Sequence, residues 1–274
     1  MNGKKTKRKK SINKARMYYG KAENMEFDKM IASAKNNKVY KLGDLAVKVF
    51  NEGYPKQDVL NEALIASRVE GTGLNIPRIH EVKLIDGKWS IVMDCIEGKT
   101  IGRLIEENPE KANEYMDLMV SLQIEMHAKD CPMLGRLKDK MNSRINNLEC
   151  IDETRKYELL TRLDSAPKHH KLCHGDFTTQ NIIISEKDNK PYIIDWNHAT
   201  VGNASADVAR TYLWLSIYNK NLAEVYLDKF CEKSKTDKSY VQRWLPVVAA
   251  ARLYYDIEEE KELIMKWIDV VEYE

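Results

Sequence analysis

Two acids and one amide lie near one another in the chain and could do chemistry together. Asp176 is followed five residues later by Asn181, in the segment 174–181 (HGDFTTQN), and Asp195 follows in the segment 193–196 (IIDW). Transfer of a phosphoryl group needs an aligned nucleophile and metal ions that neutralise phosphate oxygens, and little covalent help from the protein. One carboxylate can orient a substrate hydroxyl, and the amide oxygen and the other carboxylate are hard ligands suited to Mg²⁺.

A short hairpin is expected between these residues. Residues 181–185 and 191–195 are rich in strand-forming side chains, and Lys187-Asp188-Asn189-Lys190 between them reads as a turn. The hairpin places Asn181 and Asp195 at its open end, so both can face one metal ion. Each of the three residues alone is typical of an ordinary loop or strand end, but the set at this spacing favours a site.

A lysine and a glutamate upstream are candidates for binding phosphate. Lys48 lies in the strand-like run 45–50, and Glu62 lies in the segment 58–70, whose apolar residues recur at helical spacing. A lysine on such a strand can bind nucleotide phosphates while a glutamate of the next helix holds it by an ion pair. Either residue alone is more commonly a surface charge. The pair favours a phosphate-binding site only because Asp176, Asn181 and Asp195 follow it in the chain.

The order of predicted elements is strand-rich first and helical afterwards. The runs 38–42 and 45–50 flank Gly43-Asp44, and the runs 79–85 and 89–93 flank Asp86-Gly87, as expected for two hairpins. After Gly98 the pattern becomes helical: Thr100 can cap a short helix, and 113–129, 136–165 and the chain from 205 onward are predicted helices.

Length and composition indicate the general class of protein. The chain has 274 residues, 43% of them hydrophobic, and no apolar run long enough to span a membrane. Five scattered cysteines predict reduced thiols in a cytoplasmic protein. Residues 1–16 carry eight basic residues and no acid, which predicts a disordered tail with no specific nucleic-acid partner, since aromatic residues that could stack on bases are absent from them. The sequence does not indicate an oligomeric state.

From about Val39 to Trp214 the chain resembles the aminoglycoside phosphotransferase and choline kinase family, which is related to the protein kinases. The most specific match is the segment 174–196, followed by Ala206-Asp207-Val208-Ala209-Arg210. The resemblance implies an α+β, bilobal, protein-kinase-like fold. Residues 17–96 would form the nucleotide-binding lobe, a small antiparallel sheet with one helix, and residues 97–274 the larger, mostly helical catalytic and substrate-binding lobe.

The same resemblance implies roles for individual residues. Asp176 would be the catalytic base, Asn181 and Asp195 the Mg²⁺ ligands, and Lys48 with Glu62 the phosphate clamp. Asp207 would brace the catalytic loop. The place of a kinase hinge falls at Met93, Asp94 and Ile96: the carbonyl of Asp94 and the amide of Ile96 are expected to bind the base of ATP or GTP, with Met93 behind it. The alternative for this segment is a plain edge strand.

Two departures from the family pattern are visible. The segment 33–38 (SAKNNK) has no glycine where a glycine-rich loop usually covers the phosphates, so backbone approach is expected to depend on left-handed conformations at Asn36 and Asn37. The segment 202–205 (GNAS) lacks the acid-proline pair that often follows the glycine.

A small-molecule substrate is expected. Asp207 follows Asp195 by only twelve positions, too few for the peptide-binding segment of a protein kinase, and Gly175 replaces the arginine of the kinase His-Arg-Asp motif. The predicted function is transfer of the γ-phosphate of ATP or GTP to a hydroxyl of an aminoglycoside-like, choline-like or other metabolite. The alternative is a non-catalytic kinase-like protein that binds a nucleotide or another ligand.

Features near the C-terminus leave the acceptor open. Residues 252–274 contain eight acids and three bases, which could attract a polyamine, although a solvated helix face explains them more simply. Four aromatics could instead surround a quaternary amine or belong to the core: Trp244, Tyr254, Tyr255 and Trp267. His169, His170, Cys173 and His174 are read as a loop that enters a strand, and not as a transition-metal site.

Overall fold

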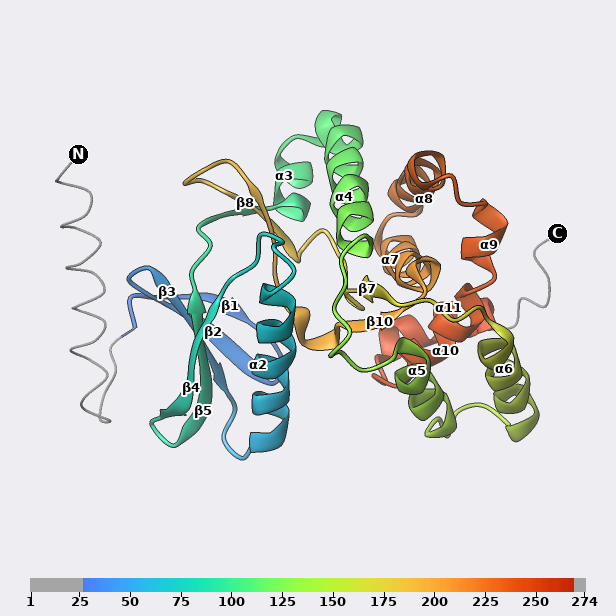
Figure 1. Ribbon diagram of the computed structural model, residues 1–274, viewed down its shortest axis with the longest axis horizontal. Coiled ribbons are helices and arrows are strands. Elements are labelled where there is room, and N and C mark those ends of the chain that lie inside the picture. Colours follow the sequence, from blue (N-terminus) through green and yellow to red (C-terminus); the bar gives the residue numbers. More distant parts are fainter. Residues whose placement is uncertain (1–26, 269–274) are drawn as a thin grey trace. The chain divides into compact units, whose positions relative to one another are not determined.

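A computed structural model describes residues 27–268, which form two compact units (Figure 1). The first unit contains the described residues up to Gly98 together with Ser185–Asn197. The second contains Lys99–Ile184 and the described residues from His198 onward. The sequence-based boundary assigned everything after residue 96 to the second lobe, whereas the structure groups 185–197, and Asp195 with it, with the first unit. The basic tail 1–16 lies outside the described residues.

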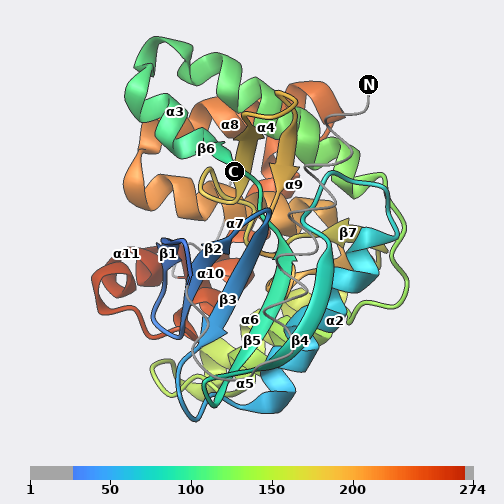
Figure 2. The same cartoon turned by 90° about the vertical axis from the view of Figure 1, so that its left-hand side faces the viewer.

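The first unit is built on a five-stranded antiparallel sheet (Figure 2) in the order β1-β2-β3-β5-β4. Its elements are β1 (Lys29–Ser33), β2 (Asn37–Leu42), β3 (Leu45–Phe50), α2 (Lys56–Glu70), β4 (Ile79–Ile85) and β5 (Lys88–Asp94). Both predicted hairpins are present. At Asp86 and Gly87 φ is 48° and 74°, as a two-residue turn between twisted strands requires.

Alternation along β3 gives the sheet two apolar faces. Val47 packs with Leu42, Ile85 and Val92 on one face. Phe50 packs on the opposite face with Ile91 and with Val59 and Ala63 of α2. Because successive side chains of a strand point to opposite faces, Lys48 shares the face of Phe50 and is directed toward α2.

The second unit is mostly helical. Its helices are α3 (Ile101–Glu107), α4 (Ala112–His127), α5 (Leu137–Asn146), α6 (Glu153–Ser165), α7 (Ala204–Tyr218), α8 (Lys220–Ser234), α9 (Lys238–Gln242), α10 (Leu245–Leu253) and α11 (Glu258–Ile268), with a 3₁₀ turn η1 (Pro109–Lys111) before α4. Figure 1 shows α4, α7 and α8 side by side, and these helices contact one another. Helices α7 and α10 are buried on most of their faces, which explains the almost continuous apolar sequence of α10 and the buried polar residues of α7, such as Asp207 and Thr211.

Short strands complete the fold. Strands β7 (Lys171–Cys173) and β10 (Thr200–Gly202) pair antiparallel, and β6 (Gly98–Thr100), β8 (Ile182–Ser185) and β9 (Pro191–Ile193) form a sheet in the order β6-β8-β9. A second 3₁₀ turn, η2 (Trp196–His198), follows β9. The predicted hairpin between residues 181 and 195 is therefore present.

One predicted helix start agrees with the structure, and one predicted helical stretch is divided. Thr100 caps α3, where its hydroxyl accepts a hydrogen bond from the amide of Arg103 at 3.1 Å. The stretch 136–165 is two helices and not one, because residues 147–152 leave the helical conformation. All five cysteines are free, and within residues 27–268 no helix has the length and apolarity needed to cross a bilayer.

Removal of the Phe50 ring should destabilise the first unit. Phe50 is 1% exposed in the cluster between sheet and helix, and a Phe→Ala change in a core costs about 3–5 kcal/mol. Phe50→Ala should lower the free energy of unfolding by that amount in urea denaturation. Leu84→Ala on β4, where the side chain is 52% exposed, should change it by less than about 1 kcal/mol. Equal losses in the two variants would contradict this assignment of the core.

Candidate active site

Lys48 and Glu62 meet in the first unit as predicted. The Lys48 ammonium is 2.6 Å from Oε1 of Glu62. β3 directs Lys48 toward α2, and on that helix Glu62 lies next to Ala63 and one turn after Val59, both of which face the sheet. The two side chains are largely buried, so each charge depends on the other for its neutralisation.

Asp195 joins this pair. Its Oδ1 is 3.2 Å from the Lys48 ammonium. The amide of Ile193 donates a hydrogen bond to the carbonyl of Asn75, which fixes the end of β9 in the first unit. Asp195 has φ of 63°, a left-handed conformation that is costly for a residue with a side chain and is a feature of functional sites.

The two carboxylates keep Lys48 charged. Burial alone would lower the pKa of Lys48, but the attraction of Asp195 and Glu62 outweighs it, and the pKa of Lys48 is raised. Lys48 therefore carries its positive charge at neutral pH beside a partly exposed carboxylate. Such an ammonium can bind a phosphate oxygen.

Asp176 and Asn181 meet in the second unit. The side-chain amide nitrogen of Asn181 donates to the backbone carbonyl of Asp176 at 2.8 Å and to its Oδ2 at 3.1 Å. The guanidinium of Arg210 lies 3.5 Å from Oδ1 of Asp176. Asp176 thus has both oxygens near donors while its side chain stays partly exposed. This geometry suits a base that must receive a proton from a bound hydroxyl.

Asp207 holds the loop that carries Asp176. Its carboxylate is buried and accepts hydrogen bonds from the backbone amides of His174 and Gly175. From α4 it accepts bonds from Gln123 and His127. Burial alone would raise the pKa of Asp207, but the hydrogen bond and charge of His127, with the other donors, lower it overall. The bracing role expected for Asp207 is therefore seen directly in its hydrogen bonds.

Gly175 has a conformation that explains why an arginine is excluded there. Its φ is +75°, and a Cβ at this position would lie 2.6 Å from the backbone carbonyl oxygen of His198. Only glycine fits such a close approach between two backbone segments at positive φ.

The predicted hinge residues lie at the end of β5. The amide of Asp94 donates to the carbonyl of Arg78, and the amide of Cys95 donates to the carbonyl of Asp44. The Asp94 side chain pairs with His80 at 2.8 Å. Met93 packs against the Phe50 cluster. Backbone recognition of a purine by Asp94 and Ile96 stays a prediction.

The glycine-free loop differs from expectation. Neither Asn36 nor Asn37 adopts a positive φ, so the predicted left-handed conformation is wrong. The turn between β1 and β2 is held instead by hydrogen bonds to Asn51: its amide donates to the carbonyl of Asn36, and its side chain donates to the carbonyl of Lys35. The hydrogen bonds to the neighbouring strand fix this loop without a glycine.

A group of basic side chains that the sequence analysis did not single out lies beside Asp176. We call Lys140, Arg144, His198 and Arg210 the basic cluster. The Lys140 ammonium donates to the carbonyl of His198 at 3.1 Å, and Arg144 donates to the hydroxyl of Tyr255 at 2.7 Å. All four line a hollow of about 20 Å³ that also borders Gly175. The i, i+4 spacing of Lys140 and Arg144 on α5 was the only sequence signal.

Burial and neighbouring positive charges lower pKa values in the basic cluster. Burial, assisted by Arg144 and Arg210 and opposed by Asp176, lowers the pKa of Lys140 to about 7. Burial and the neighbouring cations, Lys140 first, also lower the pKa of His198 far below its usual value, so His198 is neutral.

The C-terminal acids are largely paired within their own segment. Glu260 is buried in a two-point ion pair with Arg252, with both distances 2.7 Å. Glu258 pairs with Lys261 and Glu262 with Lys266. Asp269, Glu272 and Glu274 lie outside the described residues. The described part of this segment therefore supports the simpler explanation, a charged helix surface.

The four candidate aromatics have separate surroundings. Tyr254 and Tyr255 contact each other, whereas Trp267 contacts Tyr212, and Trp244 is buried. Three guanidinium groups, of Arg144, Arg210 and Arg252, lie 4.8–5.8 Å from the centre of the Tyr255 ring. These cations would repel a quaternary amine from this ring.

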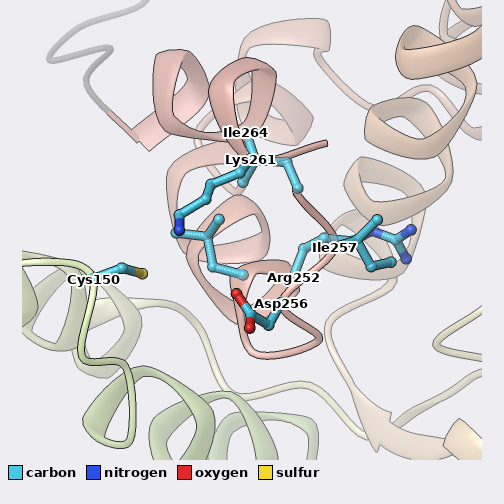
Figure 3. A pocket seen from close by; sticks show the side chains of 7 residues that line it. Cys150, Arg252, Asp256, Ile257, Lys261 and Ile264 are labelled. Atoms are coloured by element: carbon cyan, nitrogen blue, oxygen red, sulfur yellow. The ribbon is translucent and has the colours of Figure 1, made fainter. Parts of the chain in front are cut away.

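A further hollow lies between α10, α11 and the segment of Cys150 (Figure 3). It measures about 10 Å³, and its lining includes Arg252, Asp256 and Lys261. It is too small to hold more than about one water molecule and contains none of the predicted site residues.

The fold and a family model show which family the chain belongs to. The two-unit α+β fold is that of the kinase-like phosphotransferases. The model of the phosphotransferase enzyme family matches residues 29–244, and the chain belongs to that family. A comparison by sequence with curated proteins finds no match.

Solved structures show the same fold at low sequence identity. An aminoglycoside-3'-phosphotransferase of type VIII is 19% identical, with a TM-score of 0.60 over 90% of this chain and 98% of that chain. Aminoglycoside phosphotransferase APH(4)-Ia is 13% identical, with a TM-score of 0.65 over 94% and 95%. A choline/ethanolamine kinase family protein from Mesorhizobium loti is 14% identical, with a TM-score of 0.59 over 96% and 89%.

Substitution of Gly175 should destabilise the second unit. Gly175→Ala places a methyl group 2.6 Å from a backbone oxygen at positive φ, and we expect a loss of at least about 2 kcal/mol in the free energy of unfolding. Gly135→Ala is the matched control, because its Cβ would have no atom within 4 Å. It should be neutral or slightly stabilising. Equal effects of the two changes in chemical denaturation would contradict the close approach.

Lys140 should make stability depend on pH. Its pKa is about 7 in the folded chain and about 10.4 in an unfolded one, so between these values the unfolded state binds more protons. The free energy of unfolding therefore gains from Lys140 as pH rises through this window, by at most about 1.4 kcal/mol per pH unit. Lys140→Met should remove this gain, as urea denaturation at pH 6 to 9 would measure. Parallel pH profiles for wild type and variant would contradict it.

Proposed function

We propose that this protein transfers the γ-phosphate of ATP or GTP to a hydroxyl group of a small molecule. The observation that carries the proposal is the charged group Lys48, Glu62 and Asp195 in the first unit. A buried ammonium, kept protonated by two carboxylates, is the arrangement that a phosphate-binding lysine needs. The family, and the nucleotide complexes among the solved structures with this fold, support the same activity.

Asp176 is the proposed catalytic base. The hydroxyl oxygen of the acceptor attacks the γ-phosphorus and forms the new oxygen–phosphorus bond. The bond from the γ-phosphorus to the bridging oxygen breaks, and the nucleoside diphosphate leaves with that electron pair. The hydroxyl proton passes to Asp176, whose position is fixed by Asn181 and Arg210.

The donor atoms present are suited to Mg²⁺. Because the amide nitrogen of Asn181 donates to Asp176, its amide oxygen is directed elsewhere and is available as a ligand. Asp195 uses Oδ1 toward Lys48, which leaves its other carboxylate oxygen for a metal. The two residues flank β8 and β9 in the chain, and both offer hard oxygen ligands. Mg²⁺ held by such ligands would neutralise phosphate oxygens.

Other parts of the proposal concern the two substrates. Lys48 binds nucleotide phosphates and Glu62 holds it in place, while Met93, Asp94 and Ile96 receive the base. The acceptor is small, because Asp207 follows Asp195 by only twelve positions. Aminoglycosides and choline-like amines are the acceptors suggested by the names of the solved structures with this fold.

Removal of the base should abolish turnover but not nucleotide binding. Asp176→Asn should lower kcat by about 10²–10⁴-fold in a coupled nucleoside-diphosphate assay with an accepted alcohol, since a general base contributes about this much. Lys48→Met should instead remove the increase in Tm caused by Mg-nucleotide. Asp188→Asn, a change in the exposed turn between β8 and β9, is the control and should alter neither quantity. Full activity in Asp176→Asn would show that Asp176 is not the base.

The same measurements separate the enzyme from a binding protein. A non-catalytic protein would show no turnover with any acceptor in a broad panel, and one that binds a ligand other than a nucleotide would also show no Mg-nucleotide shift in Tm. The retained Lys48, Glu62, Asp176, Asn181 and Asp195 favour the enzyme.

A further inference from the structure

The basic cluster concentrates positive charge next to the proposed base. Arg210 reaches Asp176 at 3.5 Å. Lys140 and Arg144 lie one turn apart on α5, and together with His198 and Arg210 they surround one hollow. The second unit therefore brings three cationic side chains from two helices to the loop where the acceptor hydroxyl is expected.

Arg210 is balanced by Asp176, whereas the contacts of Lys140 and Arg144 supply little negative charge. Lys140 bonds to a carbonyl oxygen and approaches the imidazole of His198, and Arg144 bonds to a phenol hydroxyl. Asp207 borders the hollow, but its oxygens accept hydrogen bonds from four other donors. The contacts described for Lys140 and Arg144 thus lack a carboxylate, in contrast to Arg252, which binds Glu260 at two points.

One donor in the cluster has no partner. The Nε atom of Arg210 is buried and makes no hydrogen bond within the described part of the chain. Buried polar groups are nearly always satisfied, and an exception calls for a ligand or water. Burial, and after it the charges of Arg144 and Arg210, lower the pKa of Lys140, and an incoming anion would stabilise its charged form.

Cationic acceptors fit this region poorly. Two like charges 4 Å apart repel by about 4 kcal/mol near a protein surface. An ammonium group of an aminoglycoside or a choline-like amine would face Lys140 and Arg144 on approach to Asp176, and three guanidinium groups already lie around the Tyr255 ring.

We propose that the acceptor is a small alcohol that carries an anionic group, a carboxylate or a phosphate, which Lys140 and Arg144 bind beside Asp176. This inference rests on the proposed phosphotransfer. Arg144 can bind such a group at two points, and Lys140 acts as a point charge. The hollow of about 20 Å³ has room for about one water molecule, so the partly exposed side chains of Lys140 and Arg144 would have to move to admit the group.

Anion binding can be measured without nucleotide or turnover. Sulfate serves as the probe, because its charge is constant between pH 6 and 9. Wild-type Tm should rise by several degrees with sulfate against chloride of equal ionic strength, and the rise should shrink at pH 9, where Lys140 is deprotonated.

Variants locate the bound anion. Lys140→Gln and Arg144→Gln should each lose most of the sulfate-specific shift. Lys138→Gln on the same helix, whose side chain pairs with Asp164, controls for general salt effects and should keep it. Lys48→Gln should also keep it, which excludes the nucleotide site. An equal shift in all four variants would overturn the proposal.

Acceptor preference provides the second measurement. In a panel of one alcohol with neutral, amine, carboxylate and phosphate substituents, an anionic member should have the highest kcat/KM. Arg144→Gln should raise the KM for the anionic acceptor at least tenfold with a smaller change in kcat. Arg144→Lys should restore part of the lost affinity. The values of kcat/KM for the carboxylate and phosphate members show which of the two anionic groups the site prefers. Preference of the wild type for the amine would overturn the inference while leaving phosphotransfer intact. Sulfate binding without nucleotide turnover on any acceptor would instead refute the proposed function.

Discussion

The buried carboxylate of Asp207 is the interaction on which the second unit depends. A charge in the interior is tolerated only if donors surround it, and here they come from α4 and from the backbone of the catalytic loop. Two consecutive loop amides must point inward to reach it, which sets the backbone of His174 and Gly175. The tight approach of Gly175 to His198 follows from the same requirement. Asp176 comes next in the chain, so its direction is fixed by a residue that does no chemistry.

In the first unit, the side chains of the site are positioned by the periodicity of a strand and a helix. There the period of a strand directs Lys48 to one face, and the period of a helix directs Glu62 back toward it. These periodicities are visible in the sequence, which is why the hairpins, α2 and the Lys48–Glu62 pair could be predicted. The segment 174–195 was equally predictable, because its residues are close together in the chain and the hairpin between them is short.

Contacts between distant segments could not be predicted in this way. β1 has an exposed, mixed sequence without alternation, and β7 and β10 are three residues each, so no period could develop. The basic cluster combines residues 140, 144, 198 and 210, and Tyr255 reaches it from beyond α10. Each of these is an ordinary polar residue in its own segment. The assignment of 185–197 to the first unit was missed because chain order, and not packing, suggested the boundary.

In the proposed function, chemistry and choice of acceptor are encoded in different parts of the second unit. The groups proposed for catalysis lie on a loop held by α4 and α7, whereas Lys140 and Arg144 lie on α5, which takes no part in the bonds to Asp207. A change of charge on one face of α5 can alter which molecule approaches Asp176 without disturbing the brace. A shared fold at 13–19% identity is then compatible with acceptors of opposite charge. If the proposed anion site is correct, the charge around the acceptor, and not the fold, carries the information about the substrate.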